Sequence, residues 1–88
     1  KGRKKRMIIT SGFNVYPREV EIVLNMHPAV GESKVIGKPD LMRGEVVKAL
    51  VVKKEGASAD EKAILKHCRT YLSSYKIPRE IEFVDRLS

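Results

Sequence analysis

The fold of this chain is decided by residues 2–21, GRKKRMIITSGFNVYPREVE. A cationic run from Lys1 to Arg6 leads into two β-prone pieces that flank Ser11-Gly12. Because glycine readily adopts the backbone angles of a tight turn, this pattern predicts a β-hairpin. Pro17 suits the first position of a helix, and the acidic residues just after it complement the helix dipole. The stretch therefore predicts a hairpin that runs directly into a helix.

Downstream of this stretch, the apolar pattern predicts strands and one more helix. Ser58 and Glu61 have the spacing of a capping box at the start of that helix. The almost continuously apolar Val46–Val52 is typical of a central strand covered on both faces. The predicted elements are a hairpin over 7–10 and 13–16, a helix from Pro17 that ends at His27-Pro28, strands over 30–37 and 46–52, a helix whose apolar stripe is Ile64, Cys68, Tyr71 and Leu72, and a final strand over 80–85.

The segments between these elements have the residues of loops and turns. Residues 37–40, Gly-Lys-Pro-Asp, indicate a loop, and residues 43–45, Arg-Gly-Glu, indicate a turn. Pro78 prevents the second helix from continuing. We therefore expect the α+β fold class: a small domain, residues 1–88, with an N-terminal β-hairpin and a roughly three-stranded sheet packed with two helices.

The size of the chain limits what it can do alone. With 88 residues, 42% of them hydrophobic and 33% charged, it suits one small globular domain. A domain of this size buries only about 60% of its unfolded surface, which leaves little room for a deep substrate pocket of its own. We therefore expect that any chemistry takes place at a site completed by a larger partner.

The positive charge is concentrated at one end. The net charge is +7, from 18 Lys and Arg against 11 Asp and Glu, and five of the basic residues lie within Lys1–Arg6. The rest of the chain is close to balanced. This distribution favours a local contact with an anion, or a solvated charged end, over a broad nucleic-acid-binding face.

The reactive side chains do not form a complete active site. Cys68 is the only cysteine, so an intrachain disulfide and a cysteine metal cluster are excluded, and a reducing cytoplasm is consistent with this. We expect Cys68 to pack in the core. His27 and His67 lie far apart in the sequence without an obvious set of ligands, so we expect structural roles for both and no metal site. The longest apolar run, 46–52, is too short to cross a bilayer.

Residues 2–21 closely resemble a signature of the AMP-forming acyl-CoA synthetases, a superfamily that also includes nonribosomal peptide adenylation domains and firefly luciferase. The resemblance continues in the same order through 37–40 (GKPD), 43–49 (RGEVVKA), 75–78 (YKIP) and 83–87 (FVDRL). It covers essentially the whole chain. It implies the mobile C-terminal domain of such an enzyme, most like a medium- or long-chain fatty acid–CoA ligase.

This resemblance implies an enzyme that uses ATP and CoA. A carboxylic acid, here a fatty acid, reacts with ATP to give an acyl-adenylate and pyrophosphate, and CoA then attacks the adenylate and releases AMP. Between the two steps the small domain rotates against its partner, the enzyme's own N-terminal adenylation domain. The resemblance further implies that Mg²⁺ accompanies ATP without binding to this chain, a cytoplasmic location, no nucleic-acid partner and no transmembrane segment.

The resemblance also implies roles for individual residues. Arg3 matches an arginine that reaches the nucleotide, and Lys5 falls on the hinge of the rotation. Gly12 matches a glycine in the tunnel for the pantetheine arm of CoA, where a side chain would block close approach. The residues expected to line this tunnel are Ser11, Gly12, Phe13 and Asn14.

The catalytic side chain of the first step is not expected in this chain. The adenylation lysine of the family is expected beyond Ser88, so residues 1–88 are expected to end before its loop and to be inactive alone. Glu19 matches an acid at the start of the helix, with a structural role. Asn14 stands where some relatives have a basic residue near CoA.

Two alternatives remain open. One is a stand-alone nucleic-acid-binding module built on Lys1–Arg6, whose affinity would fall steeply with salt because phosphate neutralisation releases counterions. The other is an adenylation domain that serves a carrier protein, in which case the basic face would meet an acidic partner.

Overall fold

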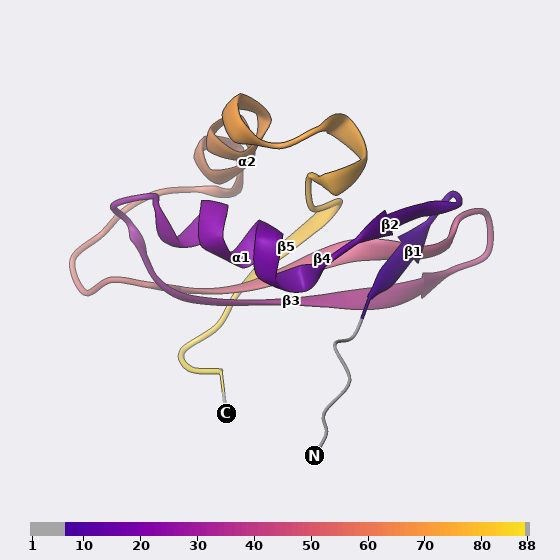
Figure 1. The fold of residues 1–88 in the computed structure, drawn as a ribbon. Helices are drawn as coiled ribbons and strands as arrows, with labels where there is room; N and C mark the ends of the chain where they lie inside the picture. Colours follow the sequence, from indigo (N-terminus) through magenta and orange to yellow (C-terminus); the bar gives the residue numbers. More distant parts are fainter. Residues whose placement is uncertain (1–6, 88) are drawn as a thin grey trace, which may run out of the picture.

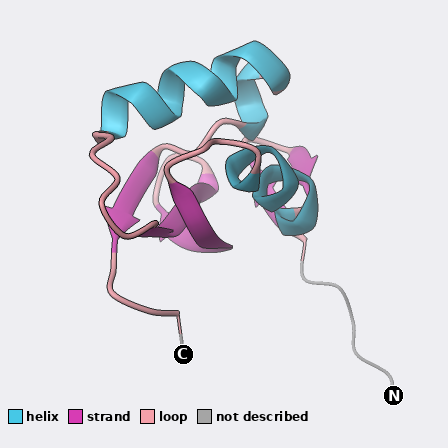
Figure 2. Ribbon diagram, turned by 90° about the vertical axis from the view of Figure 1, so that its left-hand side faces the viewer, coloured by secondary structure: helices cyan, strands magenta, loops and turns pink. Residues whose placement is uncertain are grey.

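Two α-helices and five strands make up the part of the chain that the computed structural model describes, residues 7–87. In chain order they are β1 (Ile8–Thr10), β2 (Phe13–Val15), α1 (Pro17–Asn25), β3 (Val30–Asp40), β4 (Gly44–Lys53), α2 (Glu61–Tyr71), a short 3-10 helix η1 (Ser74–Lys76) and β5 (Glu80–Phe83). Both α-helices lie on the same side of the sheet (Figure 1), and Figure 2 shows α1 nearly end-on below α2. The α+β class, the N-terminal hairpin and the two helices are confirmed. Neither helix of the described residues has the length and apolar composition that crossing a membrane requires.

β4 is the central strand of the sheet. One of its edges pairs with β3 in antiparallel fashion along almost the whole of both strands. Its other edge is shared by two short strands: β1 meets it where Thr10 lies opposite Gly44, and β5 runs parallel to it from Lys48 to Val51. The β1–β2 hairpin thus joins the predicted three-stranded sheet, and the result is one sheet of five strands.

The face of the sheet under the helices carries the core. On β4, Val47, Ala49 and Val51 lie on this face and are buried. On the opposite face Val46 is buried, and Leu50 and Val52 are only partly buried. The prediction that this strand is covered on both faces is therefore wrong for the part that carries Leu50 and Val52, because both helices pack on one side. The core cluster consists of Ile8, Val15, Val20, Leu24, Val30, Val35, Val47, Ala49, Val51, Ile64, Cys68 and Ile81.

The connection between β3 and β4 is shorter than predicted. Residues 37–40, predicted as a loop, are the end of β3, and the turn lies at 41–43 instead of 43–45. The backbone N–H groups of β3 point alternately toward β4 and toward the outer edge of the strand. The nitrogen of Pro39 is on the outer side, where no described strand pairs with β3, so the missing N–H costs the sheet no hydrogen bond.

α2 begins at a different cap from the predicted one. Asp60, and not Ser58, is the N-cap: its Oδ1 accepts a hydrogen bond from the backbone N–H of Ala63 at 3.0 Å. An aspartate immediately before the first helical residue satisfies one of the free N–H groups of the first turn, which is the role that the serine was predicted to have.

The apolar stripe of α2 is shorter than predicted. Ile64 and Cys68 are fully buried as expected, but Tyr71 is 54% exposed. Tyr71 is the last residue of the helix, and its ring lies beside that of His67, with centroids 5.2 Å apart, instead of entering the core.

Truncation of Ile64 tests this description of the core. Ile64 in α2 has no exposed surface, whereas Ile22 in α1 is 51% exposed. We expect Ile64→Ala to lower the free energy of unfolding by about 2–5 kcal/mol, since a cavity adds to the lost burial. The matched variant Ile22→Ala should change it by about 0.5 kcal/mol or less. Denaturant unfolding measures both, and equal losses would contradict the assignment.

Candidate functional site

The turn between β1 and β2 exposes backbone at the edge of the domain. Thr10 lies opposite Phe13, so Ser11 and Gly12 alone form the turn, and both have positive φ angles, 52° and 84°. Such angles are typical of the turn that matches the twist of a hairpin. A β-carbon added to Gly12 would meet no atom within 4 Å, so the backbone there faces open space. The turn thus leaves room for another molecule to approach closely.

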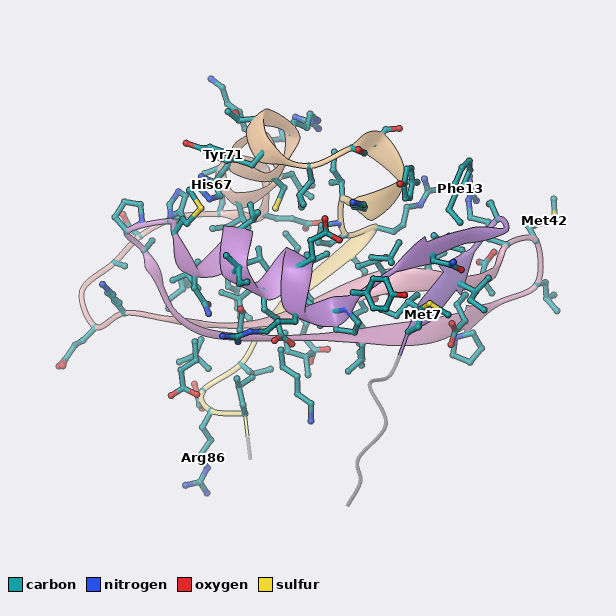
Figure 3. The ribbon with its side chains drawn as sticks, in the orientation of Figure 1. Met7, Phe13, Met42, His67, Tyr71 and Arg86 are labelled. Carbon is teal, nitrogen blue, oxygen red and sulfur yellow. The ribbon has the colours of Figure 1, made fainter. Side chains whose placement is uncertain are left out.

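This turn is hydrogen-bonded to the turn between β3 and β4. The backbone N–H of Ser11 donates a hydrogen bond to the carbonyl oxygen of Arg43 at 2.9 Å. The second turn is itself closed by Asp40, whose Oδ2 accepts from the N–H groups of Met42 and Arg43 at 3.1 and 2.9 Å. The two turns therefore hold each other in a defined position at one end of the domain, where Figure 3 shows Phe13 and Met42.

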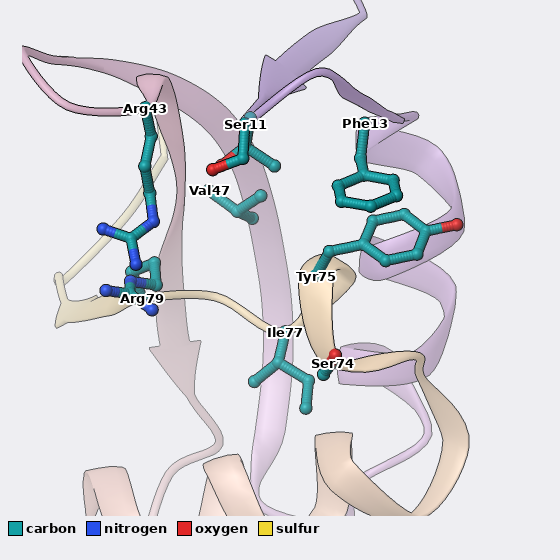
Figure 4. Close-up of a pocket in the computed structure, with 9 residues that line it drawn as sticks. Ser11, Phe13, Arg43, Val47, Ser74, Tyr75, Ile77 and Arg79 are labelled. Carbon is teal, nitrogen blue, oxygen red and sulfur yellow. The ribbon is translucent and has the colours of Figure 1, made fainter.

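A cleft of about 250 Å³ lies beside the two turns. At one side the rings of Phe13 and Tyr75 stack, with centroids 4.4 Å apart and planes inclined by 19°. Figure 4 shows the side chains of Arg43 and Arg79 together at the opposite side. The residues that line the cleft are Thr10, Ser11, Phe13, Arg43, Val47, Ser74, Tyr75, Ile77 and Arg79.

The two arginines make this cleft suitable for an anion. A guanidinium group offers paired N–H donors that match phosphate and carboxylate oxygens. Within residues 7–87, neither Arg43 nor Arg79 forms an ion pair with an acidic side chain. The stacked rings form an apolar wall across from them. The arrangement suits a ligand that joins phosphate groups to an apolar part.

Comparison with known proteins identifies the family. Residues 19–88 match the AMP-binding enzyme C-terminal domain. The chain is 53% identical over 85 residues to a long-chain-fatty-acid–CoA ligase of Yersinia pestis, covering 97% of this chain and 15% of that protein. The crystal structure of ATP-bound MatB from Rhodopseudomonas palustris matches with a TM-score of 0.93 and 45% identity, over 99% of this chain and 17% of that one. A fatty acyl CoA synthetase of Mycobacterium tuberculosis matches with a TM-score of 0.90 and 41% identity, over 98% and 17% of the two chains.

The chain belongs to this family of C-terminal domains. It spans about 15% of the length of the curated relatives that it matches. Membership of the family confirms the resemblance on which the expected site residues depend, and it does not favour the alternative of a nucleic-acid-binding module.

The structure places two of the four predicted tunnel residues in the lining of the cleft and a third beside them in the turn. Ser11 and Phe13 line it, and Gly12 lies between them in the turn. Asn14 is exposed on β2 and is not among the lining residues. The geometry therefore groups three of the four residues, and their proposed contact with pantetheine remains a prediction.

The cleft also has lining residues that the sequence analysis did not predict. Arg43, Tyr75 and Arg79 come from segments far downstream of the hairpin. Segments 43–49 and 75–78 carry the family resemblance, and this was the signal in the sequence that could have pointed to Arg43 and Tyr75; Arg79 lies just after the second segment. Their proximity to the hairpin depends on the pairing of β4 with β1 and on the return of the chain through η1, which no local pattern reveals.

His27 and His67 lie against each other, with ring centroids 5.1 Å apart. Because a carbonyl oxygen only accepts, Nε2 of His67 donates to the backbone oxygen of Val23 at 2.7 Å, while Nδ1 of His27 accepts from the N–H of Ala29 at 3.1 Å. These bonds support the structural roles expected for both rings. In the described part of the chain, no group of three or more His, Cys, Asp or Glu side chains is placed to hold a metal ion.

Cys68 provides a test by titration. It is fully buried, and burial raises the pKa of its thiol from 9.0 to about 11. Because the folded-state pKa is the higher one, the stabilisation from the neutral thiol is complete below pH 9 and is lost as the pH rises through 11. We expect the free energy of unfolding to fall over this range, and Cys68→Ala to remove that part of the fall. Alkylation near pH 8 should be slow in the native protein and fast after denaturation; rapid native labelling would contradict the burial of the thiol.

Proposed function

We propose that this chain is the mobile C-terminal domain of an ATP-dependent, AMP-forming fatty acid–CoA ligase. Its family and its 53% identity to a long-chain-fatty-acid–CoA ligase support this proposal. The observation that carries it is the open turn at Gly12 beside a cleft with two arginines. A ligand with a narrow thiol-bearing arm and several phosphate groups, as CoA has, fits both features.

The proposed enzyme carries out two half-reactions at one site. In the first, a carboxylate oxygen of the fatty acid attacks the α-phosphorus of ATP, and pyrophosphate leaves. In the second, the sulfur of CoA attacks the acyl carbon of the adenylate, AMP leaves, and the thiol proton is released. The large N-terminal domain would hold the acyl group and the ATP with its Mg²⁺. The adenylation lysine, expected beyond Ser88, would stabilise charge in the first transition state, so residues 1–88 would be inactive alone.

In the proposed thioester-forming state, the β1–β2 turn faces the pantetheine arm of CoA. Gly12 presents its backbone without a side chain, which lets the arm pass close to the domain. Ser11 and Phe13 flank this path from the cleft, and Asn14 would contact the arm or its partner domain from the exposed side of β2.

In the same state, the arginines of the cleft neutralise the phosphates of CoA. Arg43 reaches the cleft from the turn that is hydrogen-bonded to Ser11, and Arg79 reaches it from the position just before β5. The Phe13–Tyr75 stack provides an apolar surface, and the pantetheine arm of CoA would lie along it. Positive charge and an apolar wall in one cleft would select CoA over a thiol that lacks phosphate groups.

The proposed rotation involves two residues outside the described part of the chain. Lys5 would be the hinge, and Arg3 would contact ribose or phosphate oxygens of the nucleotide from the junction between the domains. Rotation serves the chemistry because the two transition states need charge stabilisation and access in different places. We place the enzyme in the cytoplasm, where a free thiol such as that of Cys68 persists.

Substitution of Gly12 tests the proposal in the full-length enzyme. We expect Gly12→Leu to lower CoA-dependent turnover by about a hundredfold, because a side chain displaces the reacting thiol, and to leave ATP–pyrophosphate exchange unchanged. Gly56→Leu is the matched control: Gly56 has φ 81° and nothing within 4 Å of an added β-carbon, so backbone strain and free space are equal. Equal loss of both half-reactions in Gly12→Leu would count against the tunnel.

Arg43 tests the assignment of the phosphates. A hydrogen bond to a charged group contributes about 1.5–3 kcal/mol, so Arg43→Met should lower kcat/KM for CoA by about tenfold to a hundredfold. Turnover with pantetheine, which has no phosphate groups, should not change. Arg86→Met is the control, because Arg86 is exposed and lies away from the cleft (Figure 3). A similar loss with both acceptors would remove Arg43 from phosphate recognition.

The same acceptor series decides between free CoA and a carrier protein. If the domain served a carrier, the wild-type enzyme would acylate the phosphopantetheine of an acidic carrier protein and would turn over CoA no faster than pantetheine. We expect CoA to be the preferred acceptor, because the two arginines face a cleft of the size of a small ligand.

A further inference from the structure

The aromatic wall of the cleft is connected to the helix that follows the hairpin. Nζ of Lys76 in η1 donates a hydrogen bond to Oε2 of Glu19 in the first turn of α1, at 2.7 Å. The neighbouring residue, Tyr75, stacks on Phe13 of β2. Two consecutive residues of η1 thus contact the hairpin and the start of α1. These contacts are distant in sequence, since Lys76 and Glu19 are 57 positions apart.

We infer that the Glu19–Lys76 bridge is a positioning element for CoA, which holds η1 against the hairpin and so sets the width of the cleft. This inference rests on the proposed function, because it names how the same cleft is kept in shape. Glu19 and Lys76 do not line the cleft. They act through Ser74 and Tyr75, the two residues of η1 that line the cleft.

The connection between α2 and β5 is packed against the core on both sides of η1, by Leu72 before it and by Ile77 after it. None of the three residues of η1 is fully buried, so burial alone does not fix it. Its backbone hydrogen bonds are local, from Lys76 to Ser73 and from Ile77 to Ser74, until Arg79 donates to Val47 on β4. Between these two core contacts, the bridge and the ring stack hold η1 itself against the hairpin and the start of α1.

The surroundings of the bridge favour the ionised pair. The Lys76 side chain is only 19% exposed, and its hydrogen bond to Glu19 raises its pKa above the usual 10.5. Glu19 also stands in the first turn of α1, where the partial positive charge of the helix N-terminus favours a carboxylate. Lys76 and the helix dipole therefore both stabilise the charged form of Glu19.

The expected consequence is specific to the second half-reaction. If η1 moves away from the hairpin, Ser74, Tyr75 and Ile77 no longer form a wall opposite the arginines, and CoA meets a wider, less ordered cleft. Binding of CoA then includes the ordering of this wall, which raises its KM. Formation of the adenylate does not use the cleft and should be unaffected.

The test uses the full-length ligase with Lys76→Met, Glu19→Gln and the double variant. We expect Lys76→Met and Glu19→Gln each to raise KM for CoA by about tenfold, with little change in kcat or in ATP–pyrophosphate exchange. The double variant should be no worse than Lys76→Met, because the two changes remove the same contact. Lys76→Arg, which keeps the charge, should recover most of the affinity.

Lys48→Met is the matched control. Lys48 pairs with Glu82 at 2.9 Å, its side chain is also 19% exposed, and its pKa is also raised by that hydrogen bond, but it does not line the cleft. We expect its KM for CoA to equal that of the wild type. Thermal unfolding of every variant separates a loss of positioning from a loss of folding.

Three outcomes would overturn the inference. They are an unchanged KM for CoA in Lys76→Met, an equal rise in Lys48→Met, and additive effects in the double variant. Each leaves the proposed function in place if Gly12→Leu still blocks only thioester formation. If the wild-type enzyme forms no CoA thioester at all, the proposed function fails and the role of the bridge fails with it.

Discussion

The antiparallel ladder between β3 and β4 is the interaction on which the rest of the structure depends. It runs without interruption from the pair Glu32–Val52 to the pair Asp40–Gly44. β1 and β5 enter the sheet only through the other edge of β4, and the helices pack on the side chains that β4 presents on one face. Because the ladder places the start of β4 beside Thr10, it also decides where the hairpin turn lies. The position of the candidate site is thus a consequence of strand pairing more than of local sequence.

Among residues 7–87 no strand pairs with the outer edge of β3, and side chains of α1 bond to groups along it. Oε2 of Glu21 accepts the outward N–H of Val35 at 2.9 Å, and Oγ of Ser33 donates to Oδ1 of Asn25 at 2.7 Å. Pro39 has no N–H to offer at this edge. Unpaired edges invite pairing with other chains, so these groups favour the folded monomeric sheet. α1 therefore has three roles. It covers the core, bonds to groups at the outer edge of β3, and contacts η1 through its first turn.

Features that depend on neighbouring residues could be predicted from the sequence, and features that depend on packing could not. The turn at Ser11-Gly12 and the helix start at Pro17 follow from backbone preferences of the residues themselves. The predicted N-cap of α2 was wrong because the side chains of Ser58 and Asp60 can both accept a hydrogen bond from a helix N–H. The packing of the helix decides which of them does so. Residues 37–40 have loop composition, yet pairing with β4 makes them strand. Tyr75 and the two arginines of the cleft were not predicted for the same reason, since they meet the hairpin only in the folded chain.

The described part of the chain contributes shape and positive charge to the candidate site, and no activated nucleophile or base. Its one buried thiol is kept neutral by a raised pKa, and both histidines are engaged in structural hydrogen bonds. Under the proposed function, the domain assists both half-reactions by moving, which requires that its surface keep its shape during the movement. The bond between Ser11 and Arg43 lies within the domain, so the turn has its shape before any substrate arrives. A surface organised in this way loses little free energy to reorganisation when it reaches the reacting groups, and this is the physical advantage of holding an open glycine turn in a rigid frame.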